Sequence, residues 1–405
     1  MGSGKFRFDL FEPEIAGVLF NCSYINLPFQ IPVVCEEVNY LLTKCGNTFF
    51  FNLSYPDISS HLHDCSINAK IVLDLAWEKI NTGHWKDVDA NWRYVYTLAS
   101  LFKVLCLLAE KRNKTDIIKA CDMGLLMGAP LMQNILSKIA AKLTDMLLKE
   151  RGCAKKIKRI KLSPESEGLK LIHNISRKNS VSHDEFYKLY VAKKEPVLLL
   201  DAIKDWPAFG TNRWSVECIL NKAGYRTVPI EIGSKYTDDN WTQKLMTVED
   251  FVESYIWNKS CQKEIGYLAQ HNIFDQIPEL FDDIAIPTYI TTTEVDISIY
   301  FGPGGTISPL HFDPKHNLLA QVIGEKYIRL YPKEATDFLY PRTNSWLSNT
   351  SQVDVENPDL EAFPLFPKAP YLECILREGD LLYIPPGCWH YVRSLSTSLS
   401  ISFWW

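Results

Sequence analysis

The second half of the chain consists mainly of short β-prone runs separated by turns, and this pattern limits the fold more than any other feature. The run V-D-I-S-I-Y-F, from Val295 to Phe301, alternates apolar and polar residues as a half-buried strand does. Similar runs surround Gly324 and follow the turn P-P-G at 385–387. Because many short strands leave edges that must be covered or closed, we expect a jelly-roll or barrel architecture here.

Two histidines and an aspartate lie in this β-rich part in a pattern that suits a metal ion. His311 and Asp313 are two positions apart in S-P-L-H-F-D, so a strand places both side chains on one face. His390 comes later, in L-L-Y-I-P-P-G-C-W-H-Y-V, beside the turn at 385–387. Two imidazoles and one carboxylate on neighbouring strands form the facial triad that holds non-haem Fe(II) and leaves coordination positions open. The sequence therefore predicts a metal site at these three residues.

Two other groups of polar residues contain the residue types of a metal site. His183 and Glu185 also form H-x-E, but Ser182 followed by Glu185 is typical of a capping box at the start of a helix. We therefore interpret that pair as structural. His61, His63 and Asp64 have no further ligand cluster nearby in sequence, so we expect a solvated loop there.

Lys326 follows His311 in V-I-G-E-K-Y-I-R-L-Y, which reads as two strands joined at Gly324 and Glu325. Period-two alternation places this lysine on the same face as Ile328 and Leu330. An inward-facing ammonium group is costly unless it meets an opposite charge. We expect it to receive the far carboxylate of a dicarboxylic cosubstrate whose other end chelates the metal. The alternative is an exposed edge lysine that guards against aggregation.

Several motifs together resemble one known family. S-P-L-H-F-D, the following lysine, N-T-S-Q-V-D-V-E-N-P-D and G-D-L-L-Y-I-P-P-G-C-W-H-Y-V are similar to the JmjC group of Fe(II)- and 2-oxoglutarate-dependent oxygenases. Y-L-A-Q-H-N-I-F-D-Q-I-P-E-L and the terminal S-I-S-F-W-W fit it as well, so the resemblance covers roughly residues 180–405. It implies a double-stranded β-helix of the cupin type. It also implies Fe(II) as cofactor, with 2-oxoglutarate and O2 as cosubstrates.

The resemblance also assigns roles to individual residues. It implies that the metal ligands His311, Asp313 and His390 are the catalytic residues, and that the cosubstrate contacts are Tyr267, Ser308, Asn317 and Lys326. Core packing is an alternative for Tyr267, and a turn is an alternative for Ser308. The substrate pocket of the family matches Glu231, Tyr236 and Trp241, which offer the acid and flat aromatic surfaces that a guanidinium group needs. The alternative is that the three residues have structural roles only, with Glu231 as a carboxylate on an edge strand and Tyr236 and Trp241 as aromatic residues that fasten the following loop.

The activity implied by the resemblance is hydroxylation of arginine side chains in a protein or peptide substrate, such as a histone or another chromatin-associated protein. A histone methyl-lysine demethylase shares the metal site and is the main alternative. A histone-tail peptidase is less supported, because the chain has no H-E-x-x-H motif. A non-catalytic chromatin scaffold is a further alternative, against which the intact triad argues. The family also implies a regulatory role in transcription and the cell cycle.

The first part of the chain has a different pattern. From about residue 33 to residue 150 apolar residues recur at helical spacing, as in I-L-S-K-I-A-A-K-L-T-D-M-L-L-K-E. No fixed-period repeat is evident, and the helix pairs resemble a small bundle or a repeat-like stack. A chain of 405 residues is long for one core. We therefore expect an α+β protein with a helical domain at 1–150, a linker at 151–181 and a β-rich catalytic domain at 182–405.

Composition limits the location and partners of the protein. Eleven cysteines without any C-x-x-C indicate a reducing compartment. The basic run K-K-I-K-R-I-K, at 155–161, suits nuclear import or a solvated linker, and we expect the nucleus, with the cytoplasm as the alternative. The net charge of −5 does not indicate direct nucleic-acid binding. The most apolar helix candidate, Tyr94–Ala109, contains Lys103 and is short for a membrane span, so no membrane association is expected.

Overall fold

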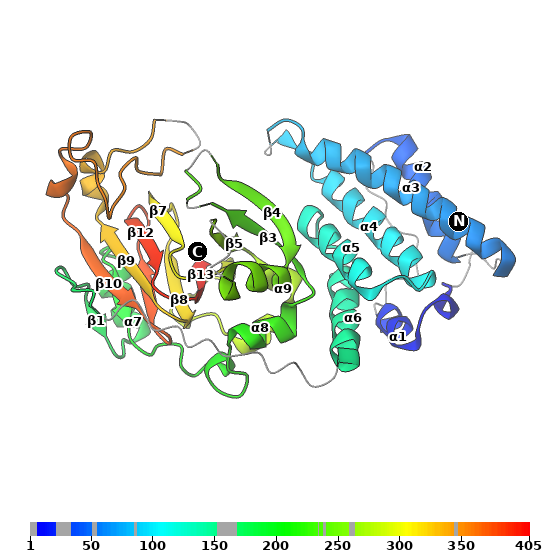
Figure 1. The fold of residues 1–405 in the computed structure, drawn as a ribbon, viewed down its shortest axis with the longest axis horizontal. Coiled ribbons are helices and arrows are strands. Elements are labelled where there is room, and N and C mark those ends of the chain that lie inside the picture. The colour runs from blue at the N-terminus through cyan, green and yellow to red at the C-terminus, as the bar shows by residue number, and fades with distance from the viewer. Residues whose placement is uncertain are drawn as a thin grey trace. The chain divides into compact units, whose positions relative to one another are not determined.

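The computed structural model describes residues 6–21, 34–50, 55–84, 87–151, 168–233, 235–237, 240–258, 264–343 and 347–405. The chain divides into two compact units. The helical unit comprises residues 1–155 together with Tyr225–Thr227, and the β-rich unit comprises 156–224 and 228–405. The expected α+β class, with helices first and a β-rich domain second, is confirmed (Figure 1). The basic run at 155–161 lies outside the described residues.

The helical unit is built from antiparallel neighbours along the chain. Its helices are α1 (Pro13–Asn21), α2 (Glu36–Phe50), α3 (Tyr55–Asn81), α4 (Asn91–Ala109), α5 (Lys114–Met127) and α6 (Ile135–Arg151). Asn113 caps α5 by accepting a hydrogen bond from the backbone N–H of Thr115. Apolar side chains from all six helices form one continuous core, as the helical spacing predicted.

Two expectations for this unit are wrong. His61, His63 and Asp64 lie within the long helix α3 and not in a loop. The helical register continues through these polar residues because the opposite side of α3 is buried, as at Leu62 and Cys65. Helix α4 spans Asn91–Ala109, and its 19 residues are long and apolar enough to cross a membrane, so the expectation that this segment is too short for a membrane span is wrong. However, 61% of its most apolar window is buried against the rest of the unit, which explains its composition as that of a core helix.

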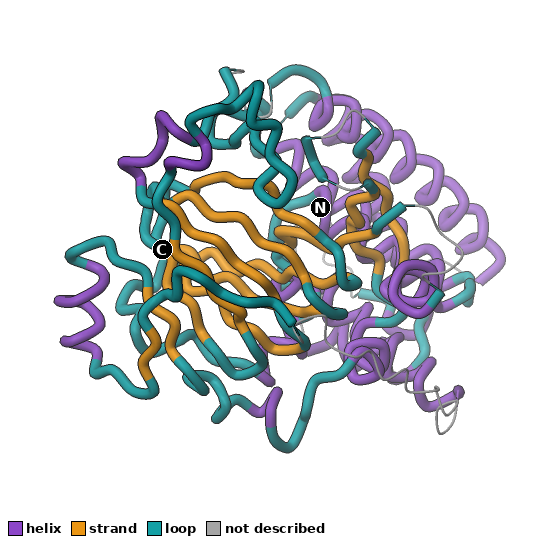
Figure 2. Tube along the Cα trace, turned by 60° about the vertical axis from the view of Figure 1, so that its left-hand side comes forward, coloured by secondary structure: helices purple, strands orange, loops and turns teal. Residues whose placement is uncertain are grey.

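The β-rich unit contains two sheets, whose strands run side by side in Figure 2. The nine-stranded sheet has the order β1-β2-β11-β8-β13-β6-β5-β3-β4. The four-stranded sheet has the order β10-β9-β12-β7. The strands are β1 (Arg177–Lys178), β2 (Val197–Leu199), β3 (Thr227–Ile232), β4 (Thr242–Thr247), β5 (Gly266–His271), β6 (Asp296–Gly302), β7 (Ile307–Phe312), β8 (Asn317–Ile323), β9 (Lys326–Tyr331), β10 (Leu372–Leu376), β11 (Leu381–Ile384), β12 (Trp389–Ser394) and β13 (Ser398–Trp404).

From β6 to β9, and again from β10 to β13, sequence neighbours alternate between the two sheets, which is the arrangement of a double-stranded β-helix, while β9 and β10 pair within the small sheet. Strand β7 lies in the small sheet, β8 in the large one and β9 in the small one again. The turn between β8 and β9 depends on Gly324, whose φ is +73° and where a Cβ would lie only 2.1 Å from the carbonyl oxygen of Thr397. The alternation places the side chains of both sheets around one interior space, where the site lies.

Short helices cover the remaining parts of the β-rich unit. They include α7 (His183–Phe186), α8 (Val216–Ala223), α9 (Val248–Phe251) and α10 (Ile273–Gln276). Helix α7 begins with the expected capping box, in which Ser182 and the Glu185 side chain each accept a backbone N–H from the other. The structural interpretation of the H-x-E pair at His183 and Glu185 is therefore confirmed.

Candidate metal and cosubstrate site

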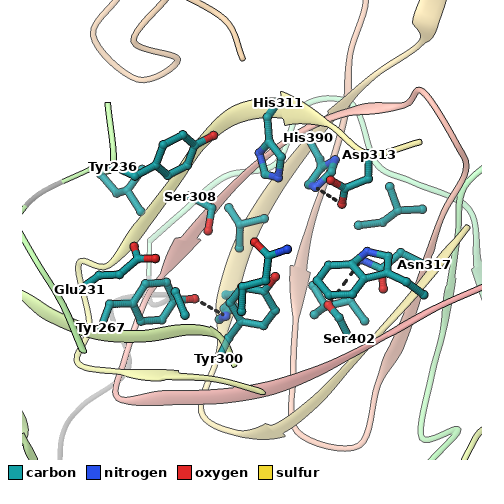
Figure 3. A pocket seen from close by; sticks show the side chains of 18 residues that line it. Glu231, Tyr236, Tyr267, Tyr300, Ser308, His311, Asp313, Asn317, His390 and Ser402 are labelled. Atoms are coloured by element: carbon teal, nitrogen blue, oxygen red, sulfur yellow. Dashed lines mark hydrogen bonds and ion pairs between the residues drawn. The ribbon is translucent and has the colours of Figure 1, made fainter. Parts of the chain in front are cut away.

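Strands β7 and β12 bring the three residues of the expected triad together. His311 lies on β7 and pairs across the sheet with His390 on β12, while Asp313 directly follows β7. One ligand atom from each of the three residues lies within 4.8 Å of the other two. His390 Nε2 is 3.7 Å from Asp313 Oδ2, and all three side chains point toward one another (Figure 3). Among the described residues, this is the one His/Cys/Asp/Glu cluster with that geometry.

Both histidines are held so that the same ring nitrogen faces the cluster. Nδ1 of His311 is 2.7 Å from the carbonyl oxygen of Pro309, and Nδ1 of His390 is 3.1 Å from that of Cys388. A carbonyl oxygen only accepts, so each Nδ1 carries the proton and each Nε2 keeps its lone pair for a metal. Burial of His390, and then the neighbouring His311, lower the pKa of His390. That histidine is therefore neutral at pH 7, as ligation requires.

The donor set fits a divalent iron ion. Two neutral imidazoles and one carboxylate on one side of a pocket leave the opposite side open, as in non-haem Fe(II) oxygenases. The pocket that these three residues line is also lined by Ser308, Asn317 and Lys326. A ligand that occupies this pocket therefore touches both the triad and the lysine.

Lys326 is buried in the wall of this pocket without a carboxylate partner. Its side chain is 2% exposed, and its Nζ donates a hydrogen bond of 3.2 Å to the hydroxyl of Tyr267. It lies 5.4 Å from the ring centroid of Tyr300, and within the described residues it forms no ion pair. Burial lowers its pKa to about 7. The expectation that Lys326 faces inward is met, and no carboxylate of the described residues lies within ion-pair distance of it.

The remaining predicted cosubstrate contacts lie around the same ammonium group. Tyr267, Ser308 and Asn317 line the pocket from β5, β7 and β8. The amide of Asn317 donates a long hydrogen bond of 3.4 Å to Ser402, but its buried Oδ1 has no partner. An unpartnered buried carbonyl oxygen is costly, which indicates that a bound molecule or water completes it. These residues therefore fit a dicarboxylate with one end at the triad and the other at Lys326.

Two aromatic residues of the pocket, Tyr300 and Trp404, are among those that were not predicted as contacts. Tyr300 on β6 lines the pocket, and burial of its hydroxyl raises its pKa. The alternation in V-D-I-S-I-Y-F could have placed Tyr300 on the face opposite Ile299 and Phe301. Trp404 on β13 pairs with Asn317 on β8, and its buried Nε1 has no hydrogen-bond partner. It is a buried wall residue of the pocket.

Two of the three predicted substrate residues, Glu231 and Tyr236, belong to the pocket lining, and Trp241 does not. Trp241 donates a hydrogen bond of 3.3 Å from Nε1 to Glu231 Oε2. Burial raises the pKa of Glu231, whose carboxylate has no cationic partner among the described residues. Trp241 is 37% exposed. The structure thus brings an unpaired carboxylate and two aromatic side chains together near the triad.

Comparisons with known proteins agree with this architecture. A family model described as a cupin-like domain matches residues 183–405. A second, described as KDM8-like N-terminal ARM repeats, matches residues 37–156. The repeat-like interpretation of the helical unit is therefore confirmed, although its repeats have diverged too far for a fixed period to be evident in the sequence.

Similar curated proteins cover most of the chain. The Danio rerio protein named Lysine-specific demethylase 8 is 44% identical over 393 residues, which is 91% of this chain and 94% of the relative. The Drosophila melanogaster Jumonji C domain-containing protein 5 is 39% identical, over 82% of this chain and 85% of its own length. The Arabidopsis thaliana Lysine-specific demethylase JMJ30 is 38% identical, over 83% and 85%. The chain therefore belongs to the JmjC family of oxygenases, in the branch that carries KDM8-like ARM repeats before the cupin-like domain.

Proposed function

We propose that this chain hydroxylates arginine side chains of protein substrates, with Fe(II) at His311, Asp313 and His390 and with 2-oxoglutarate as cosubstrate. The observation that carries the choice of arginine is Glu231. This carboxylate is largely buried at the pocket wall and, among the described residues, has only the Trp241 indole as a hydrogen-bond donor. A guanidinium group would supply the missing positive charge and up to two parallel hydrogen bonds.

Different residues of the pocket would bind the metal, the cosubstrate and the substrate. The triad would hold the metal, and Lys326 with Tyr267 would bind the distal carboxylate of the cosubstrate. When bound, Fe(II), 2-oxoglutarate and O2 together supply the oxidation that places an oxygen atom on a C–H bond. Glu231, Tyr236 and Trp241 would hold the substrate so that its target carbon faces the triad. The buried walls around Tyr300 and Trp404 would keep water away from the reacting atoms.

A panel of peptides tests the proposal. Peptides that contain arginine, lysine or methylated lysine are incubated in air with the protein, Fe(II) and 2-oxoglutarate, and their masses are compared. We expect the arginine peptides to become heavier by one oxygen. The His311→Ala variant should give no product, because the triad loses a ligand.

The Glu231→Gln variant tests the arginine pocket itself. It keeps the size of the side chain and removes the charge, so kcat/KM for an arginine peptide should fall about 100-fold, as loss of a charge-assisted contact does. Glu253→Gln, at an exposed position of the same unit, is the matched control and should leave kcat/KM unchanged. An unchanged value in Glu231→Gln would remove the basis for choosing arginine.

A second candidate is demethylation of methyl-lysine in histones, which the names of two similar proteins favour. It uses the same triad and cosubstrate site, since oxidation of an N-methyl group needs the same oxidant. Loss of methyl groups from the lysine peptides, with no gain of oxygen at arginine, would select this candidate.

A further inference from the structure

The segment at 349–356 belongs to the motif N-T-S-Q-V-D-V-E-N-P-D, for which the metal and cosubstrate site gives no role. It lies directly beside the metal strand β7. The backbone N–H of Phe312 donates to the Asn349 carbonyl oxygen at 3.0 Å, and the Asn349 side chain donates back to the Phe312 carbonyl at 3.0 Å. The N–H of Ser351 donates to the Leu310 carbonyl at 2.8 Å, and Thr350 forms a bridge with His311. The segment therefore extends the small sheet at β7, the strand that carries His311 and directly precedes Asp313.

The same segment also holds the residues on the substrate side. The hydroxyls of Thr350 and Tyr236 are 3.2 Å apart and share a hydrogen bond. Asp354 Oδ2 is 2.6 Å from the Nζ of Lys235, the residue before Tyr236. Two consecutive residues that follow the Glu231 strand are thus fastened to the segment that borders the metal strand.

Internal contacts fix the segment in one conformation. Asp354 Oδ1 accepts the backbone N–H groups of Glu356 and Asn357, each at 3.2 Å. Glu356 Oε2 accepts the hydroxyl of Tyr391 at 2.9 Å and forms an ion pair with Arg393 at 2.8 Å, and both partners lie on β12, the strand of His390. The carboxylate that meets Lys235 is therefore anchored to both metal-bearing strands.

We propose that Asp354 and Lys235 are positioning residues that hold Tyr236 at the pocket wall and thereby set where the substrate side chain lies relative to the triad. An isolated, partly exposed ion pair stabilises a fold very little. This pair instead joins two pocket walls that come from distant parts of the chain. A shift of about 1 Å between such walls can cost about 100-fold in rate. The proposal deepens the proposed function and rests on it for the identity of the substrate.

Four variants test the pair. Lys235→Met and Asp354→Asn each remove one charge, and the asparagine retains the side-chain oxygen that caps Glu356 and Asn357. Lys235→Arg keeps the charge and serves as the conservative rescue. Lys204→Met is the matched control, because Lys204 forms a similar ion pair of 2.7 Å with Asp201 at an exposed position of the same unit.

The first measurement needs no activity. Hydrogen exchange of the backbone amide of Gly233, which lies two residues before Lys235 and donates to the Ile265 carbonyl oxygen at 3.0 Å, should become at least several-fold faster in Lys235→Met and Asp354→Asn, and should not change in Lys235→Arg or Lys204→Met. Equal exchange in all variants would overturn the positioning role. If the wild-type protein hydroxylates no arginine peptide, the proposed function fails, and this measurement still decides the role of the pair.

The second measurement is steady-state kinetics on the arginine peptide. We expect KM for the peptide to rise about 5- to 20-fold in Lys235→Met and Asp354→Asn, with KM for 2-oxoglutarate unchanged. The double variant should be no worse than either single one, since both remove the same link. A KM for 2-oxoglutarate that rises in parallel would show a general structural defect and would overturn the proposal.

Discussion

Two cations that are almost fully buried, Arg226 and Lys326, have opposite surroundings. Arg226, which belongs to the helical unit, is 1% exposed, and its Nε and Nη2 donate to Asp122 Oδ1 at 3.0 and 2.7 Å. Asp122 Oδ2 also accepts the backbone N–H of Thr227 at 2.6 Å. Lys326, in the β-rich unit, is 2% exposed, and the described residues offer it only the Tyr267 hydroxyl and two aromatic rings.

The difference in surroundings indicates that Arg226 is a structural charge, whereas Lys326 is suited to bind a negatively charged ligand. A buried ammonium group without a counter-ion destabilises the fold. Its presence therefore indicates a role in function, such as the binding of an anionic ligand. The pocket beside Lys326 contains the triad and the unpartnered Asn317 carbonyl oxygen, whereas Arg226 is fully matched by Asp122. Among the described residues, Lys326 is thus a buried cation without a carboxylate partner, at a position where a dicarboxylate would complete the pair.

The largest effect on this comparison is expected from Arg226→Met. The substitution leaves the Asp122 carboxylate buried and without its counter-ion, so the free energy of unfolding should fall by about 3–5 kcal/mol. Chemical denaturation of the full chain, followed by circular dichroism, measures the change. Adding Asp122→Asn removes the stranded charge and should restore more than half of the loss. A single variant that unfolds like the wild type would contradict the assignment of this pair as structural.

Lys326→Met should change stability in the opposite direction. Methionine fills a similar space without a charge, so the free protein at pH 7 should gain about 1–3 kcal/mol and unfold at a higher temperature. Affinity for 2-oxoglutarate should fall about 100-fold, because the distal carboxylate loses its cation. Calorimetric titration with Mn²⁺ in place of Fe(II) measures binding without turnover. A variant that binds the cosubstrate normally would show that this lysine is not its anchor.

The part of the site that depends on local spacing could be predicted from sequence. The H-x-D pair on a strand and the histidine after P-P-G gave the triad, because alternation along a strand fixes the face that each side chain occupies. The inward position of Lys326 followed from the same alternation. The fold class followed from the switch between helical and period-two spacing along the chain.

The contacts that could not be predicted join residues far apart in sequence. Nothing local pairs Arg226 with Asp122, or Lys235 with Asp354, since each pair forms only after the chain has folded. The helix at His61 was missed for a related reason. Three polar residues on the exposed side looked like a loop, while the buried side at Leu62, Cys65 and Ala69 carried the helical pattern. The packing of this buried side against the rest of the helical unit makes the segment helical.

The smallest expected effect is the pH dependence that Lys326 gives to stability and to cosubstrate binding. Burial lowers the pKa of Lys326 from 10.5 to about 7, and the groups that face it are the hydroxyl and ring of Tyr267 and the ring of Tyr300. In the unfolded chain the lysine keeps its ordinary pKa, so above pH 7 the unfolded state binds more protons. The contribution of this residue to stability therefore rises with pH from about 7 to about 10.5.

Cosubstrate binding should show the reverse dependence. A bound carboxylate favours the charged lysine, so binding takes up a proton above pH 7, and affinity should fall by up to about tenfold per pH unit. Below pH 7 the lysine is already charged, so this contribution is constant. Titrations of 2-oxoglutarate with Mn²⁺, in buffers of different ionisation enthalpy, count the protons taken up. In Lys326→Arg the side chain stays charged throughout, so the proton uptake should disappear even if the affinity is weaker. Proton uptake that persists in Lys326→Arg would show that another group takes up the proton, and would contradict the assignment of the titration to Lys326.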